Sequence, residues 1–349
     1  MKIFNTLPQA DLGAVAERTH QIAAAGYTGI VTLENRHDPF LPLAVAASTG
    51  EKLELTTGVA IAFLRSPMSA AHLAWDLNQA CGGRFTLGLG PQIRAHNEKR
   101  FSVPWSAPAP RLREYANALR AIWRCWKFGD KLSFEGEHYR FSLMTPNFVP
   151  EDDDRPLPAI ALAAVGPRML NLSGEVADAV YLHPFCTPLY IEQAVLPGVD
   201  AGLAKSGRLR ENFAIIGGGY IATGRDQQAL DEMIEWVRMR IGFYGSTPAY
   251  WPVFEAHDLG DLGRELNALT KAGKWDKLSG LIPDEMVHQV AAVGLHHEIK
   301  DKVIERFGGY ADGVFASVSY EMPDNMPREL VSEIAALPTR WLAYETGTA

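Results

Sequence analysis

Residues 84–96 read Arg-Phe-Thr-Leu-Gly-Leu-Gly-Pro-Gln-Ile-Arg-Ala-His and combine a strand pattern with a polar turn. Large apolar side chains alternate with small residues from Phe85 to Leu89, which is typical of a parallel strand covered on both faces. Glycine and proline then break the strand, and Gln92 and His96 follow. Because ligands bind at the carboxyl ends of parallel strands, this stretch predicts a site at its polar end.

Composition narrows the classes of protein that the chain can belong to. The 349 residues are 47% hydrophobic and 21% charged, which is ordinary for a globular protein. A net charge of −8 argues against a nucleic-acid backbone binder, which would carry a clustered basic excess. The sequence has no basic amphipathic helix, membrane-length apolar run or signal-peptide layout, so we expect a cytoplasmic protein without a membrane partner. The three cysteines lie in apolar surroundings and are expected to be buried and reduced: Cys81, Cys125 and Cys186.

Eight strand candidates alternate with helical segments along the chain. They lie near residues 3, 30, 57, 87, 161, 180, 217 and 315, within longer apolar runs such as 53–63, 213–222 and 313–318. This alternation predicts an α/β fold, a single (β/α)8 TIM barrel over residues 1–349. Two insertions are expected, a β-hairpin excursion at about 129–158 after the fourth helix and a helical insertion at about 243–283 before the eighth strand. An open doubly wound sheet is less favoured, because the first strand–helix turn lacks a glycine-rich dinucleotide fingerprint.

Polar and glycine residues collect where the predicted strands end, and each has an ordinary structural alternative. The run after the second strand carries Glu34 and His37, which could equally form a solvated loop with local ion pairs. Gly58 could mark only a bulge in the core, and the Gly-Pro pair at 166–167 only a helix start. A helix that begins at the barrel rim can nevertheless bind phosphate. His96 and His183 could each be structural.

No metal centre is expected. Metal-dependent hydrolase barrels usually place histidines on the first strand, and residues 2–5 contain none. His296 and His297 are adjacent at a predicted helix start, point in different directions and are interpreted as a surface pair.

The chain resembles the bacterial luciferase-like monooxygenase superfamily of flavin- and deazaflavin-dependent barrel oxidoreductases. The segments that carry the resemblance follow the family's order over essentially the whole chain. They are residues 29–34 with 37–40, 56–60 with 65–67, 83–90, 163–167 and 177–179. The similarity is greatest to a subgroup that uses the deazaflavin coenzyme F420, which residues 243–250 also indicate.

The resemblance implies roles for individual residues. Gly58, Val59 and Ala60 match a third-strand bulge, often with a non-prolyl cis peptide, that packs against the cofactor ring. Gly90 and Gln92 match the fourth-strand turn near the ring and the phosphate tail. The loop and helix start that take the cofactor phosphate correspond to Ala164, Val165, Gly166 and Pro167. His37, Glu34 and His96 are the candidate proton donors.

The function implied is hydride transfer between F420 and a small organic substrate, and we expect the protein to be a homodimer. One alternative is an FMN-dependent monooxygenase on the same fold, and another is a cofactor-binding protein without catalysis. The aromatic insertion either covers the mouth of the site and excludes water or forms a dimer surface. No motif identifies the substrate.

Overall fold

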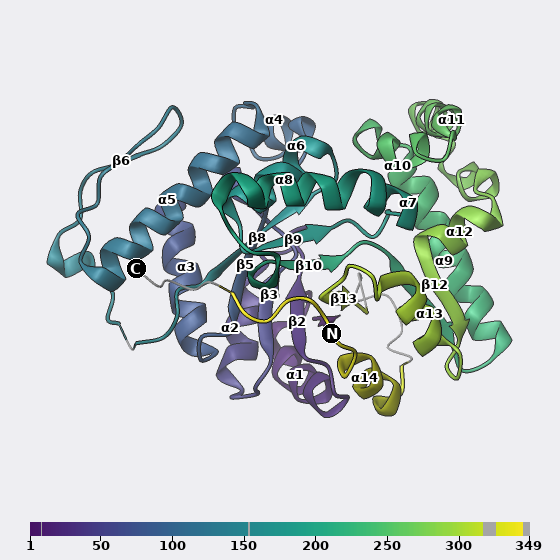
Figure 1. Cartoon of the computed structure of the whole chain (residues 1–349), viewed down its shortest axis with the longest axis horizontal. Helices are drawn as coiled ribbons and strands as arrows, with labels where there is room; N and C mark the ends of the chain where they lie inside the picture. Colours follow the sequence, from purple (N-terminus) through teal and green to yellow (C-terminus); the bar gives the residue numbers. More distant parts are fainter. Residues whose placement is uncertain (8, 153, 317–325, 345–349) are drawn as a thin grey trace.

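Eight parallel strands close into a barrel in the computed structural model, which describes residues 1–349 except 8, 153, 317–325 and 345–349 (Figure 1). Their order around the described barrel is β3-β2-β1-β13-β10-β9-β8-β5, and pairing between β3 and β5 closes the ring. The predicted (β/α)8 fold is therefore confirmed. The strands are β1 (Lys2–Thr6), β2 (Gly29–Thr32), β3 (Glu54–Thr57), β5 (Phe85–Gly90), β8 (Ala159–Ala164), β9 (Ala179–Leu182), β10 (Ala214–Gly217) and β13 (Gly313–Phe315).

Helices follow the strands and surround the barrel. Side chains cap two of them: Ser66 accepts a hydrogen bond from the Met68 N–H with proline at the first helical position, and Asp226 accepts one from the Ala229 N–H. Outside the helical insertion, the described α-helices are α1 (Val15–Ala24), α2 (Phe40–Ser48), α3 (Pro67–Ala80), α4 (Arg94–Lys99), α5 (Pro108–Phe128), α6 (Pro167–Val176), α7 (Pro188–Tyr190), α8 (Leu196–Ser206), α9 (Gln227–Gly245), α13 (Ile299–Phe307) and α14 (Arg328–Ala335). No helix among the described residues is both long and apolar enough to cross a bilayer.

The single strand predicted over residues 213–222 is wrong, because the structure divides it. β10 ends at Gly217, and β11 (Tyr220–Gly224) leaves the barrel to pair in parallel with β12 (Ala291–Leu295). Gly217 and Gly218 both have φ of +89°, a region that side chains disfavour, so the glycine run turns the chain out of the barrel.

Two other predicted strands are longer than the observed ones. The run 53–63 separates into β3, the short β4 (Ala60–Ile61) and a helical turn, Ala62–Leu64. The last strand ends at Phe315, and the predicted residues 317 and 318 lie outside the described part of the chain.

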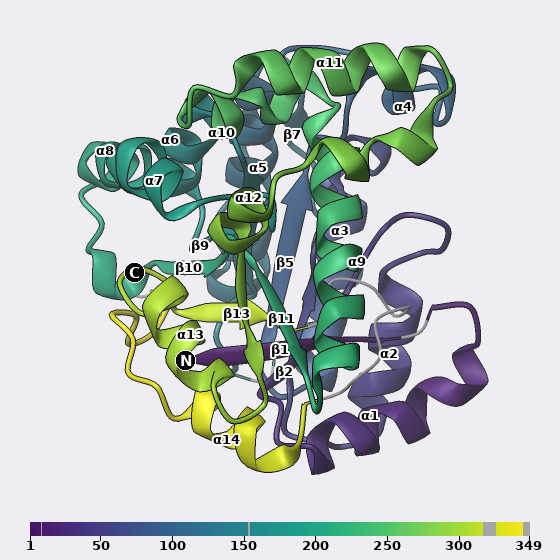
Figure 2. The same ribbon diagram turned by 90° about the vertical axis from the view of Figure 1, so that its right-hand side faces the viewer.

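Both predicted insertions are present. The hairpin pairs β6 (Phe134–Glu135) with β7 (Arg140–Phe141). The helical insertion contains α10 (Trp251–Glu255) and α11 (Gly260–Lys271) and leads to α12 (Asp284–Val290), although its predicted start at 243 falls inside α9. In Figure 2, β5 runs toward the side of the molecule where α4 and α11 lie, whereas α1 and α14 lie at the opposite end.

The amino end of the barrel is closed by residues near the C-terminus. Trp341 and Tyr344 pack against the side chains that fill the barrel, including Phe4, Val31 and Tyr181. The Trp341 N–H donates to Asp312 Oδ1 at 2.9 Å, and the two aromatic rings lie 4.8 Å apart.

Two aspartates hold the beginnings of neighbouring strands. Asp178 accepts from the Ile160 N–H and Asp312 from the Ile215 N–H, both at 2.8 Å. Arginines pair with both carboxylates, which are 1–2% exposed: Arg120 and Arg208 with Asp178, and Arg210 with Asp312. The Asp178 segment, which contributed to the family resemblance, therefore stabilises the end of the barrel away from the predicted site.

Candidate active site

The third and fourth barrel strands (β3 and β5) bring the predicted ring-binding glycines together. The Gly58–Val59 peptide bond is cis, and Ala60 pairs with Leu89 beside it. A Cβ atom on Gly58 would lie 2.4 Å from Val31 Cγ2, and one on Gly90 would lie 2.7 Å from Val59 Cγ2. Both distances are shorter than carbon atoms tolerate, so only glycine at these two positions leaves room for the Val31 and Val59 side chains that pack against them.

Glu34 is held in contacts that link the loops after β2 and β3. Its carboxylate accepts from the Arg65 guanidinium at 2.8 and 2.9 Å and from the Ile61 N–H at 2.6 Å. The Glu34 side chain is only 9% exposed, and Arg65 also pairs with Asp38. Because both of its oxygens accept hydrogen bonds, this geometry favours a positioning role for Glu34 over the predicted proton-donor role.

The two other candidate proton donors are exposed on neighbouring loops. His37 follows β2, and His96 lies in α4. Neither side chain has a hydrogen-bond partner among the residues that the structure describes. The loops themselves are joined, because the Arg100 guanidinium donates to the Asn35 carbonyl.

The turn after β5 has a fixed shape. Asn97 is fully buried, and its amide donates to the Pro91 carbonyl at 2.9 Å and the Ile93 carbonyl at 3.1 Å. Gln92 adopts φ of +57°, and its side-chain oxygen accepts from the Ile93 N–H. This turn therefore holds Gln92 in one conformation just beyond the end of β5.

The start of α6 has the features of an anion site. Gly166 is its N-cap, and a Cβ added there would have no atom within 4 Å, so the backbone faces open space. Pro167 begins the helix, and the exposed Arg168 follows it. The Tyr190 hydroxyl donates to the Val165 carbonyl at 2.9 Å and holds the preceding loop, which begins at Ala164. A helix N-terminus with an open glycine and an arginine can bind a phosphate group.

Sequence reasoning placed His183 at a strand end but gave it no role in the site. The structure places it directly after β9, beside a small hollow with a volume of about 10 Å³, room for about one water molecule. We call this the strand-end hollow, and its lining is Ala164, Val165, Leu182, His183, Phe185, Cys186, Tyr190, Val195 and Val253. It therefore joins the predicted phosphate loop to the helical insertion, a contact across residues far apart in sequence that periodicity could not reveal.

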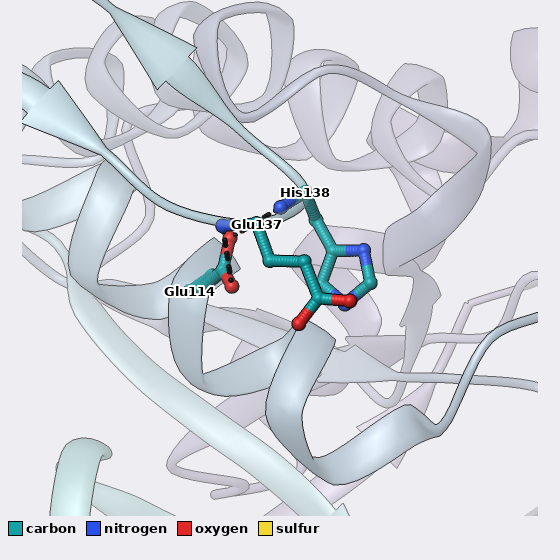
Figure 3. A group of neighbouring side chains, drawn as sticks. All are labelled: Glu114, Glu137 and His138. Atoms are coloured by element: carbon teal, nitrogen blue, oxygen red, sulfur yellow. Dashed lines mark hydrogen bonds between the residues drawn. The ribbon is translucent and has the colours of Figure 1, made fainter.

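The acidic cluster on the hairpin has a structural explanation (Figure 3). Glu114, on α5, accepts from the backbone N–H groups of Glu137 at 3.0 Å and His138 at 2.8 Å. A third such bond comes from Tyr139 at 3.3 Å. Although one ligand atom from each of Glu114, Glu137 and His138 lies within 4.8 Å of the others, the Glu114 carboxylate serves to hold the hairpin turn.

The barrel is closed, and glycines, a helix N-terminus and polar side chains lie at the carboxyl ends of its strands. This is the architecture of a (β/α)8 barrel enzyme. A family model described as luciferase-like monooxygenase matches residues 3–313, so the chain belongs to this family of oxidoreductases. The Mycobacterium tuberculosis protein Rv1360, described as uncharacterized, is 44% identical over 314 residues, which are 90% of this chain and 92% of that protein.

More distant relatives have named activities. A 5,10-methylenetetrahydromethanopterin reductase of Archaeoglobus fulgidus is 28% identical over 287 residues, covering 80% of this chain and 81% of that enzyme. The solved coenzyme F420-dependent tetrahydromethanopterin reductase of Methanopyrus kandleri superimposes with a TM-score of 0.75 at 18% identity. That superposition covers 96% of this chain and 97% of the solved chain, and it supports the barrel fold.

Proposed function

We propose that this enzyme transfers a hydride between the deazaflavin F420 and a small organic substrate. The observation that carries the proposal is the arrangement of the barrel mouth. One wall carries the cis Gly58–Val59 peptide and Gly90, two glycines packed closely against Val31 and Val59, and α6 begins with a glycine open to space. A flat ring suits the first feature and a phosphate the second. The relatives whose names include F420 or a methanopterin reductase favour F420 over FMN.

The residues of this chain would bind and orient the cofactor. The wall formed by Gly58, Val59, Ala60 and Gly90 would contact the ring, and the loop of Ala164, Val165, Gly166 and Pro167 would hold the phosphate. Gln92 would lie beside the tail. F420, when bound, supplies a carbon centre that carries a hydride and activates oxygen poorly.

The proton that accompanies the hydride requires a separate group. His37 or His96 would exchange it with the substrate, since both are exposed on the loops beside the ring wall. Glu34 would fix the loops through Arg65 rather than transfer the proton itself.

Cofactor titration of three proteins tests the proposal. Wild type, Gly166→Ala and Gly280→Ala are titrated separately with F420 and with FMN, and the fluorescence of each cofactor is followed. Both glycines face open space, so neither substitution should disturb folding. The methyl group of Gly166→Ala would occupy the open space and displace a bound phosphate from one or two N–H groups, so this variant should bind F420 about 10- to 100-fold more weakly.

The Gly280→Ala control should bind F420 like wild type. Equal affinity of the wild type and Gly166→Ala would remove Gly166 from the site. Tight FMN binding without F420 binding would replace the proposal by the flavin monooxygenase alternative. F420 binding without reduction or oxidation of any small substrate would favour a non-catalytic binding protein.

A further inference from the structure

The ring-wall segment, which we define as residues 58–61, extends beyond the last pair of the ladder between β2 and β3. That ladder ends at Thr32 and Thr57. Pairing with β5 continues through Ala60 and Ile61. The β5 side of the segment is therefore held by ordinary strand pairing, whereas the β2 side needs another support because its strand has already ended.

Glu34 supplies that support on the β2 side. Its N–H donates to the Val59 carbonyl at 3.4 Å, and its carboxylate accepts from the Ile61 N–H at 2.6 Å. The shorter of the two bonds ends on a side chain, where a strand would offer a backbone carbonyl. The position of this side of the ring-wall segment therefore depends on where the Glu34 carboxylate is held.

Arg65 holds that carboxylate with two hydrogen bonds. Two nitrogens of its guanidinium donate to the two Glu34 oxygens at 2.9 and 2.8 Å, and one of them also donates to the Ile61 carbonyl at 3.4 Å. The Glu34 and Arg65 side chains are only 9% and 18% exposed, so solvent ions screen the pair little. A planar contact of this kind fixes both the distance and the orientation of the carboxylate.

The start of α2 anchors the guanidinium in turn. Arg65 donates to Asp38 Oδ2 at 3.1 Å, and its guanidinium carbon lies 5.1 Å from the centroid of the Phe40 ring. Asp38 Oδ1 accepts from the N–H groups of Phe40 and Leu41 at 2.8 and 3.2 Å, which ties the same carboxylate to the helix. Arg65 therefore connects the ring-wall segment to α2 as well as to Glu34.

We propose that Arg65 is a positioning residue for the cofactor ring, because it sets, through Glu34, the place of the Val59 and Ile61 backbone beside which the ring binds. The inference rests on the proposed function, since the contact between ring and wall belongs to that proposal. Arg65 acts through Glu34 and needs no contact with the ring itself. Because the groups of a binding site must be held within about 0.5 Å, loss of the planar contact should change how the ring is bound.

Arg65→Lys is the variant that tests this role. Lysine keeps a positive charge beside Glu34, but a single ammonium group cannot reproduce the planar contact with both oxygens of the carboxylate. Arg113→Lys is the matched control. Arg113 makes the same kind of two-bond contact with Glu175, at 2.8 and 3.0 Å, between α5 and α6.

Hydrogen exchange followed by mass spectrometry measures the hold on the segment without any cofactor. In Arg65→Lys, the amides of the ring-wall segment should exchange about 5- to 30-fold faster than in wild type, because a charge-assisted hydrogen bond is lost. In Arg113→Lys, the same amides should exchange as in wild type. Arg65→Met removes every donor and should exchange at least as fast as Arg65→Lys, which carries the test alone if Arg65→Met does not fold.

F420 titration of wild type, Arg65→Lys and Arg113→Lys measures the effect on the ring. Fluorescence gives the affinity, and the visible circular dichroism of F420 bound at saturation reports the surroundings of its ring. Arg65→Lys should bind F420 about 3- to 10-fold more weakly and give a different dichroism spectrum at saturation. A purely structural role would lower the free energy of unfolding and leave the spectrum of the folded complex unchanged.

Unchanged exchange of the ring-wall segment in Arg65→Lys would overturn the proposal, and so would faster exchange with the affinity and spectrum of wild type. The same changes in Arg113→Lys would also overturn it, because the effect would not be specific to the Arg65 contact. Failure of wild type to bind F420 would contradict the proposed function and, with it, the role toward the ring. The exchange measurement would still show separately whether Arg65 holds the segment.

Discussion

Substitution of Gly58 by alanine tests how closely the mouth of the barrel is packed. The new Cβ would lie 2.4 Å from Val31 Cγ2, so one of the two groups must move by about 1 Å to reach ordinary contact. Val31 is 2% exposed in the barrel interior and has little room to move. Overpacking of this kind should lower the free energy of unfolding by about 1–3 kcal/mol.

Val31→Ala supplies the partner change for a double-mutant cycle. Alone, it removes two buried methyl groups and should cost about 2 kcal/mol. With Gly58→Ala, the added methyl group fills space that Cγ2 has left. The double variant should therefore be about 1–3 kcal/mol more stable than the sum of the single effects predicts.

Urea unfolding of the four proteins, followed by tryptophan fluorescence and far-ultraviolet circular dichroism, measures this coupling. Gly280→Ala is again the control and should change stability by less than about 0.5 kcal/mol. Strict additivity of Gly58→Ala and Val31→Ala would refute the steric argument. Cofactor titration of the double variant then separates two roles: if Gly58 contacts the ring, binding stays weak although stability is recovered.

Three further predictions concern stability. Glu34→Ala should lower the free energy of unfolding, measured by urea denaturation, by about 3 kcal/mol, because Arg65 loses the carboxylate that accepts two of its hydrogen bonds. Glu34→Gln should lower it by about half as much. Equal losses in the two variants would contradict the ion-pair argument. Trp341→Ala should lower the free energy of unfolding by about 2 kcal/mol in the same assay, because it opens the amino end of the barrel. Leu342→Ala is the control and should leave the free energy of unfolding almost unchanged, because Leu342 is 73% exposed. Burial lowers the pKa of His183 from 6.5, the value for an ordinary histidine, to about 3. The neutral ring therefore contributes fully to the free energy of unfolding above about pH 6.5, and this contribution is lost as pH falls toward 3. Over that pH range, the free energy of unfolding of the wild type should fall by about 3–5 kcal/mol more than that of His183→Leu. If the two proteins lose the same free energy of unfolding as the pH falls, the argument that burial keeps this ring neutral is wrong.

The barrel was predictable because its strands are buried on both faces and therefore appear as short apolar runs. The division of residues 213–222 was not predicted, although the glycines at 217–219 carried the signal. Gly217 and Gly218 adopt positive φ, which turns the chain outward, whereas the apolar residues on both sides still follow a strand pattern.

The candidate site was predictable where it follows directly from a strand end and not where it depends on pairing between distant segments. Gly58, Gly90 and Gly166 come straight after apolar runs, and the structure brings Gly58 and Gly90 to one wall. The bonds between Glu34 and Arg65 join two different loops, so no local pattern distinguishes a positioning carboxylate from an acid. The contact of His183 with Tyr250 likewise depends on how the insertion folds back over β9.

Closure of the barrel by Trp341 and Tyr344 has a consequence for biosynthesis. The first strand pairs with β13, and the Met1 amine donates to the Ala335 carbonyl at 2.9 Å, so segments that are far apart in the sequence depend on each other. A growing chain can form its early strand–helix units, but its interior stays open to water until residue 344 has been added. A chain cut short before residue 341 would therefore present an unsealed apolar lumen to chaperones and proteases.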